Sequence, residues 1–176
     1  LYFNKNWLRE CQLLSLMWKR LNMQVVVPEK SVVENVLGNV LEENPVRFGK
    51  QPLKLAEKQK EAVLLAISSP FMIVSGGPGT GKTSVAVTML RVLKQLGLAE
   101  RPALAAPTGR AAKRMSESVV NSLRSLENTE QLLPDQELLE VAAEAKTLHR
   151  LLGYFPDERS FRHHEYNPLE HDLLII

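Results

Sequence analysis

The spacing of apolar residues predicts that the N-terminal part of the chain is helical. Within residues 5–23, Trp7, Cys11, Leu14 and Trp18 follow one another at intervals of three and four. This spacing places them on one side of a helix, so the segment is expected to form an amphipathic helix.

A second helical pattern leads to a boundary in the chain. The stretch "SVVENVLGNVLEE" (31–43) repeats the apolar spacing, with Ser31 as its expected N-cap. Prolines and a glycine interrupt the pattern over residues 44–53, which marks a break between structural units. We therefore divide the chain into a helical N-terminal segment, 1–48, and a second unit, 49–176.

The second unit alternates short apolar runs with longer helical repeats. This order predicts the α/β class, with a parallel sheet whose faces are covered by helices. The expected strands are residues 71–75, 103–106 and 172–176, and the expected helices are residues 55–67, 83–97 and 109–126.

Two stretches of the second unit are polar. Residues 126–146 are acidic, with leucines and alanines at helical spacing, and their charges are expected to form a solvated face. Residues 154–170 are rich in turn-forming residues and predict a surface hairpin or loop before the last strand.

Composition changes this picture little. The chain of 176 residues suits one ordinary domain, and its net charge of +2 leaves a nucleic-acid partner open without arguing for it. The single cysteine, Cys11, excludes an internal disulfide and favours a reducing compartment, here the cytoplasm. Its leucine neighbours predict that the thiol is buried. The chain has neither a membrane-length apolar run nor a signal-peptide pattern.

The clearest chemical motif is "GGPGTGKT", which fits the phosphate-binding pattern G-x-x-x-x-G-K-[ST] between an expected strand and an expected helix. Glycines let backbone N–H groups turn toward phosphate oxygens, and the helix start attracts the same anion. Lys82 is expected to reach the β- and γ-phosphates, and the Thr83 hydroxyl to ligate Mg²⁺. The expected nucleotide-binding residues are Gly76, Gly77, Pro78, Gly79, Thr80, Gly81, Lys82, Thr83 and Ser84.

Three further stretches bear on the kind of nucleotide-binding protein. Gln59, in "LAEKQKEAV", offers a donor and an acceptor that match the N6 and N7 edge of adenine, although a surface role is open. "APTGRAAKRM" (106–115) follows the second strand, at the end of a parallel sheet where ligands bind. "TLHRLLG" (147–153) predicts a short helix that is capped by Thr147, with its histidine and arginine facing outward.

The polar groups in the last two stretches suit the phosphate oxygens of a nucleic-acid strand. The alternative for "GRAAKRM" is a capped helix with a solvated basic face, which we favour for Lys113 and Arg114. The expected DNA-binding residues are Pro107, Thr108, Gly109, Arg110, His149 and Arg150.

Taken together, "AEKQ", "GGPGTGKT", "APTGRAA" and "TLHRLLG" occur in the order of the motifs in the first motor domain of superfamily 1 DNA helicases, which residues 55–176 resemble. Within that superfamily, "LYFNKNW" and "RHHEYNPLEHDLLII" are similar to the RecD family, the alpha subunits of bacterial exodeoxyribonuclease V (RecBCD).

This resemblance implies a RecA-like fold and an ATP- and Mg²⁺-dependent helicase that moves 5′ to 3′ on single-stranded DNA. It also implies a role in double-strand break repair with RecB- and RecC-type subunits. In the family, a strand like "DLLII" leads into an acidic Walker B motif. The chain is therefore expected to be a partial motor domain that is inactive, or nearly so, by itself.

Alternatives remain open on the sequence. The chain could belong to another P-loop ATPase, such as a AAA-type remodelling enzyme. It could be a stand-alone RecD-like helicase, or a non-hydrolysing nucleotide-binding or docking module whose N-terminal helices contact partner subunits.

Overall fold

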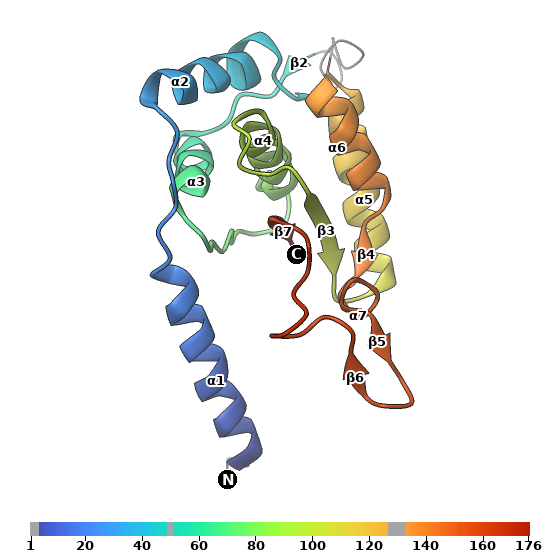
Figure 1. The fold of residues 1–176 in the computed structure, drawn as a ribbon. Helices are drawn as coiled ribbons and strands as arrows, with labels where there is room; N and C mark the ends of the chain where they lie inside the picture. Colours follow the sequence, from blue (N-terminus) through green and yellow to red (C-terminus); the bar gives the residue numbers. More distant parts are fainter. Residues whose placement is uncertain (1–3, 49–50, 127–132) are drawn as a thin grey trace.

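The computed structural model describes residues 4–48, 51–126 and 133–176 (Figure 1). The helices are α1 (Asn4–Leu21), α2 (Lys30–Gly38), the π-helical turn η1 (Asn39–Glu43), α3 (Glu57–Ser68), α4 (Lys82–Gln95), α5 (Gly109–Arg124), α6 (Leu133–Ala143) and α7 (Leu148–Leu152). The strands are β1 (Arg47–Phe48), β2 (Gln51–Pro52), β3 (Pro102–Ala106), β4 (Lys146–Thr147), β5 (Tyr154–Phe155), β6 (Ser160–Phe161) and β7 (Leu173–Ile175). The predicted α/β class is confirmed.

The main sheet is parallel, with β3 between β4 and β7. β7 pairs with the first part of β3, from Pro102 to Leu104, whereas β4 pairs with Ala105 and Ala106. Parallel neighbours need a crossover connection, which α5 and α6 supply between β3 and β4. The strands predicted at 103–106 and 172–176 are thus confirmed. Two antiparallel pairs, β1 with β2 and β5 with β6, form small hairpins, and the second confirms the predicted surface hairpin.

The prediction of a strand at residues 71–75 is wrong. This segment has no strand assignment, and Ile73 and Val74 are 73% and 40% exposed. A strand exists only through hydrogen bonds to a neighbouring strand, and none of the described strands pairs with this segment. The apolar, β-branched composition was therefore not sufficient to make it part of the sheet.

Helix α4 is the centre of the hydrophobic core. It is buried on nearly every side between Val85 and Leu93, with one apolar cluster on the side of α3 and another on the side of β3, α5 and α6. Figure 1 shows this helix between the two groups of elements. The two clusters together fix the position of this helix, which follows the glycine-rich loop of residues 76–83.

The N-terminal helix α1 forms as predicted, but it buries little. Trp7, Leu14 and Trp18 are 58%, 65% and 71% exposed, and Cys11 is exposed as well. The prediction of a buried thiol is wrong because α1 extends away from the rest of the described chain (Figure 1). No helix among the described residues has the length and hydropathy needed to cross a membrane.

Helix α2 begins two residues earlier than the predicted cap at Ser31 implies. Glu29 is its N-cap, without a side-chain hydrogen bond, so Ser31 lies inside the helix and does not cap it. The following turn, η1, contributes Val40, which is 1% exposed and packs in the cluster beside α3 and α4. The division of the chain at residues 48 and 49 stays a prediction.

The acidic stretch is only partly a solvated face. Residues 127–132 lie outside the described residues, and α6 covers the rest of the helical pattern. Asp135 on α6 is 0% exposed, because its carboxylate accepts two hydrogen bonds from Arg91 on α4, at 2.9 and 3.0 Å. The prediction of a solvated charge is wrong for this residue, since a partner 44 positions earlier brings it into the core.

Candidate nucleotide and nucleic-acid sites

The glycine-rich loop leads directly into α4, as the motif requires. Gly79 and Gly81 have φ values of 72° and 79°, in the left-handed region that glycine adopts at little cost. At Gly76, a Cβ atom would lie 2.7 Å from Thr80 Oγ1, closer than real contacts allow. The loop conformation therefore depends on these glycines.

The Lys82 ammonium folds back onto the loop that precedes it. Nζ donates hydrogen bonds to the carbonyl oxygens of Gly76 and Gly77, at 2.7 and 2.6 Å. Thr80 Oγ1 donates to the same Gly77 oxygen at 2.9 Å. Because the side chain of Lys82 is exposed, it can exchange these carbonyl oxygens for phosphate oxygens without disturbing the core.

Gln59 contacts the glycine-rich loop although it is far away in the sequence. Its Nε2 donates to the Thr80 carbonyl at 2.9 Å, and its Oε1 accepts from the Ala56 N–H at 2.8 Å. A Cβ atom at Gly81 would lie 2.9 Å from this same Nε2. The structure thus joins the start of α3 to the loop through the amide of Gln59.

The first turn of α4 supplies the remaining groups expected at a nucleotide site. Thr83 is exposed and Ser84 is half-buried, next to Lys82, at a helix start whose N–H groups and dipole favour an anion. Within the described part of the chain, no three His, Cys, Asp or Glu side chains are grouped so that they could hold a metal ion. The Thr83 hydroxyl suits Mg²⁺, which keeps several of its waters when it binds beside phosphates.

The candidate DNA-binding residues lie at the carboxyl ends of two neighbouring strands. Because Ala106 on β3 is in register with Thr147 on β4, the segments that follow both strands leave the sheet at the same edge. The Thr108 hydroxyl accepts the Ala111 N–H at the start of α5, and the Thr147 hydroxyl accepts the Arg150 N–H at the start of α7, as predicted for Thr147. Pro107, Thr108, Gly109, Arg110, His149 and Arg150 are all exposed.

A hollow of about 230 Å³ joins these two segments. It is lined by Gly109 from α5 and Arg150 from α7, and also by Lys113 and Lys146. We call it the cationic hollow. The sequence interpretation left Lys113 as a solvated helix charge and did not single out Lys146. The signal for Lys113 was its position four residues after Gly109, which places both on one side of α5.

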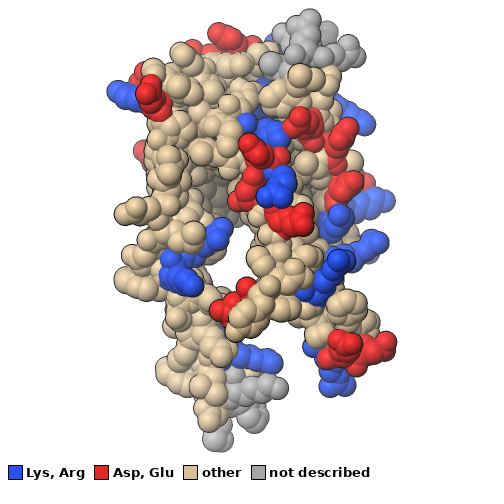
Figure 2. Space-filling view, in the orientation of Figure 1, with Lys and Arg blue, Asp and Glu red and all other residues tan. Residues whose placement is uncertain are grey.

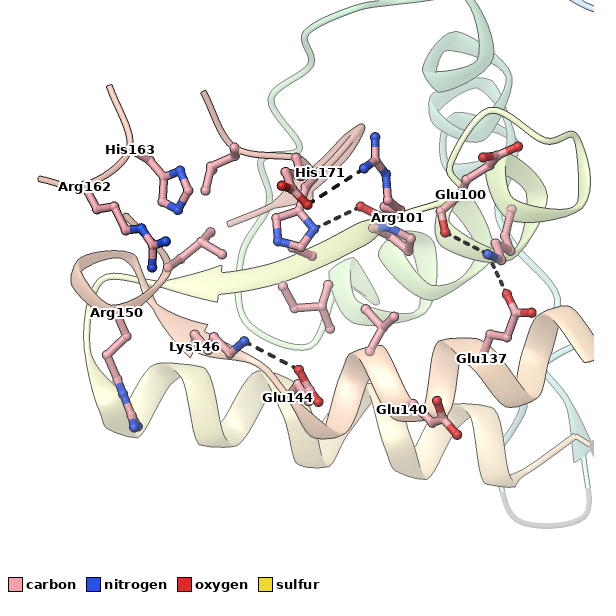
Figure 3. A pocket seen from close by; sticks show the side chains of 18 residues that line it. Glu100, Arg101, Glu137, Glu140, Glu144, Lys146, Arg150, Arg162, His163 and His171 are labelled. Carbon is pink, nitrogen blue, oxygen red and sulfur yellow. Dashed lines mark hydrogen bonds and ion pairs between the residues drawn. The ribbon is translucent and has the colours of Figure 1, made fainter. Parts of the chain in front are cut away.

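A larger hollow of about 660 Å³ lies between α6 and residues 162–171 (Figure 3). Glu137 and Glu140 of α6 form one wall together with Glu144, which directly follows the helix. Arg101, Arg162 and His171 are among the residues facing them. Several charges are already paired, as in Lys94 with Glu137 at 2.6 Å and Lys146 with Glu144 at 3.5 Å. Because acidic and basic side chains both line this hollow, its charge does not favour a nucleotide or a phosphate backbone.

Comparison with known proteins assigns residues 59–176 to a family described as the AAA domain. The matched residues begin at Gln59 and include the glycine-rich loop, α4 and the cationic hollow.

Several proteins similar to this chain are named as RecBCD subunits or as a DNA helicase. The chain is 42% identical over 126 residues to the RecBCD enzyme subunit RecD of Mycolicibacterium smegmatis. The aligned residues make up 68% of this chain and 22% of that protein. It is 41% identical to the RecBCD enzyme subunit RecD of Haemophilus influenzae, over 67% of this chain and 18% of the relative. It is 32% identical to the ATP-dependent RecD2 DNA helicase of Deinococcus radiodurans, over 69% of this chain and 13% of the relative. The aligned part of the chain spans about a fifth of the length of the RecD relatives.

Proposed function

The chain belongs to the AAA domain family and is a RecD-like helicase segment, and we propose that it supplies the ATP-binding half-site of an ATP-dependent 5′–3′ DNA helicase subunit. The subunit would act in an exodeoxyribonuclease V complex during double-strand break repair and recombination.

The observation that carries this proposal is the geometry at the start of α4. A left-handed glycine turn, an exposed lysine and a helix N-terminus converge at one point. In that arrangement the backbone N–H groups bind the phosphates of ATP, and Lys82 stabilises the charge that develops on the transferred group. Mg²⁺, held at Thr83, would neutralise phosphate charge at the same point.

DNA would bind at the carboxyl ends of β3 and β4. Arg110 and Arg150 are exposed there and offer guanidinium groups to phosphate oxygens, and the backbone of Gly109 lies beside them. Such contacts position a strand without reading its sequence, which suits an enzyme that moves along DNA.

Gln59 is proposed to select adenine. Its amide has a second N–H and a second oxygen lone pair beyond those used by Thr80 and Ala56. These free positions match adenine N7 and the N6 amino group, whereas guanine offers only acceptors along this edge. The same amide would thus bind the base and hold the loop.

Replacing Gln59 by alanine is expected to narrow the preference for ADP over GDP by about three- to tenfold, the value of one or two hydrogen bonds. Competition binding with both nucleotides measures this ratio. Gln12→Ala, at an exposed position on α1, is the matched control and should leave the ratio unchanged. If the ratio is unchanged in the Gln59 variant, Gln59 does not select adenine, and its role is to link α3 to the loop.

The proposal includes partners and a compartment. RecB- and RecC-type subunits and single-stranded DNA would be the partners, and the cytoplasm the location. A stand-alone helicase is the second candidate, because one relative is named an ATP-dependent RecD2 DNA helicase and is 32% identical over 69% of this chain. The two candidates are distinguished by purification of the full-length protein. A complex subunit should co-purify with sister subunits, whereas a stand-alone helicase should purify without them. A docking role for the exposed helix α1 is compatible with either.

The direct test is a strand-separation assay with the full-length protein, alone and with its sister subunits. Duplexes with a 5′ single-stranded tail should be unwound in the presence of ATP and Mg²⁺, and duplexes with a 3′ tail should not. Unwinding from the 3′ tail alone would contradict the proposed direction, and no unwinding from either would contradict the helicase itself. That residues 1–176 by themselves are inactive, or nearly so, stays a prediction, which a steady-state ATPase assay measures.

A further inference from the structure

Strand β3 has an open edge over its first half. β7 pairs with residues 102–104 on one side, whereas β4, on the other side, pairs only with Ala105 and Ala106. Among the strands that the structure describes, none adjoins residues 102–104 on the β4 side. Because successive N–H groups of a strand point to opposite edges, either Ala103 or Leu104 presents its N–H and carbonyl oxygen to this open side.

The open edge borders the larger hollow, of about 660 Å³, between α6 and residues 162–171 (Figure 3). All three residues of the edge line this hollow. Its volume is within the range of about 300–1,000 Å³ that is typical of ligand sites. We call it the mixed-charge hollow. It gives a short stretch of extended main chain room to lie beside β3.

The two faces of β3 are covered by different parts of the chain. Leu104 belongs to the same apolar cluster as Leu138 of α6, whereas Ala103 belongs to a second cluster, against which Leu169 packs. A strand added at the open edge would therefore lie between α6 and residues 162–171. Since the side chains of a strand alternate between its two faces, every second side chain of the added strand would face α6, and the others would face residues 162–171.

The free charges on these two sides have opposite signs. On the α6 side, Glu140 is exposed and forms no ion pair with any described residue, and Glu137 and Glu144 belong to the same wall. On the other side, Arg162 is exposed and also lacks an ion pair within the described chain, and Arg101 lies on this side as well. An added strand would meet acidic groups on one face and basic groups on the other.

The remaining charges of the lining balance one another. They form three ion pairs, at 2.6, 3.5 and 4.0 Å, with one further charge of each sign and two histidines. These are Lys94 with Glu137, Lys146 with Glu144, Arg101 with Glu170, the single charges Glu100 and Arg150, and the rings of His163 and His171. Figure 2 shows acidic and basic side chains interspersed on the side of the molecule formed by α6. A ligand that carries both signs therefore fits better than one that carries a single sign.

We propose that the mixed-charge hollow binds an extended segment of a partner protein, which adds a strand to the open edge of β3 and alternates basic with acidic side chains. Main-chain hydrogen bonds provide affinity in complexes of this kind, and alternate side chains provide specificity. The basic side chains would face Glu140, and the acidic ones would face Arg162. No residue of the glycine-rich loop lines this hollow, so the contact goes beyond the proposed function and does not depend on ATP binding.

The test is fluorescence anisotropy with the full-length protein and labelled six-residue peptides whose ends are blocked. A peptide that alternates lysine with glutamate should bind about tenfold more tightly than one with three lysines followed by three glutamates. Only the alternating order places each sign on one side of a strand, and two or three exposed ion pairs account for such a factor. N-methylation of the backbone amides of the alternating peptide should weaken its binding about tenfold, because hydrogen bonds to β3 are then lost.

Two variants test the walls of the hollow. Glu140→Gln and Arg162→Gln should each weaken binding of the alternating peptide about two- to fivefold, the value of one exposed ion pair. Glu61→Gln, at an exposed position on α3, is the control and should leave binding unchanged. Both altered side chains are exposed, so thermal unfolding should not change. Loss of affinity in the control as well would show attraction by overall charge and would overturn the proposal.

Hydrogen exchange of the wild-type protein needs no variant. Saturation with the alternating peptide should slow exchange of the Ala103 or Leu104 amide. If both amides exchange at unchanged rates, the edge is covered by another segment of the full-length chain or by a second copy, and the partner proposal is wrong. Equal binding of the alternating and block peptides, binding of neither, or full binding of the N-methylated peptide would overturn it too. None of these outcomes bears on the proposed helicase function, which is tested by unwinding.

Discussion

Replacing Lys82 by alanine is expected to lower the ATPase rate of the full-length protein by at least about 100-fold, and to abolish unwinding. The ammonium group is the cation that the loop can bring to the β- and γ-phosphates, and its stabilisation of charge is largest in the transition state. Loss of one preorganised donor of this kind costs about 10²–10³ in rate in other enzymes. Mg²⁺ would remain, so nucleotide binding should fall less than turnover.

The fold should survive this change. Lys82 is exposed, and the hydrogen bonds of its ammonium group to described residues go to the carbonyl oxygens of Gly76 and Gly77 in the loop itself. Steady-state ATPase and ADP binding are measured beside thermal unfolding, with Lys58→Ala on the exposed side of α3 as the control. A Lys82 variant that retains near-normal ATPase activity would show that this loop does not take part in catalysis.

Features that depend on neighbours in the sequence could be predicted. The apolar spacing located α3, α4 and α5, because a period of three to four residues both marks a helix and selects its buried side. The motif "GGPGTGKT" located the loop and the helix start, since glycine φ values and a following helix are local properties. The cap at Thr147 was found for the same reason.

Features that depend on distant partners could not be predicted. Residues 71–75 have the composition of a strand, but strand formation depends on a neighbour that the pattern does not name. The amphipathic pattern of α1 indicated an apolar side without indicating what covers it. Gln59 was singled out for adenine, whereas its bond to Thr80 depends on how α3 packs beside the loop.

The same limit applies to the cationic hollow and to the pair of aromatic residues on the β5–β6 hairpin. Lys113 and Lys146 are ordinary surface lysines in the sequence, and only the pairing of β3 with β4 brings them beside Arg150. Tyr154 and Phe161 lie within a turn-rich stretch, and a hairpin register was needed to place them opposite each other.

Breaking the ion pair between Arg91 and Asp135 is expected to lower the free energy of unfolding by about 3–5 kcal/mol. Both side chains are 0% exposed, and the guanidinium donates to both carboxylate oxygens. Its Nη1 also donates to the Asn44 carbonyl at 2.7 Å, so one side chain ties α4 to α6 and to the end of η1. Asp135→Asn would leave a buried positive charge without its counter-charge, and Arg91→Met would leave a buried carboxylate.

Such a loss is large for a domain, because total stabilities are about 5–15 kcal/mol. Urea unfolding, followed by circular dichroism, measures it for Asp135→Asn and Arg91→Met. The control is Glu117→Gln, which breaks the pair with Lys113 on the surface of α5, where the side chains are 78% and 59% exposed. That change should cost less than about 1 kcal/mol, as exposed pairs do.

The double variant Arg91→Met with Asp135→Leu separates the cost of burying an unpaired charge from the value of the pair. Buried ion pairs contribute little net stability once their desolvation is counted, so removing both charges should recover much of the loss. Recovery should be incomplete, because the carbonyl of Asn44 would still lose its hydrogen bond from Arg91. If each single change costs no more than Glu117→Gln, the pair is not buried in solution, and α4 and α6 do not pack as described. If the double variant is no more stable than the singles, the loss comes from the shape of the core rather than from its charges.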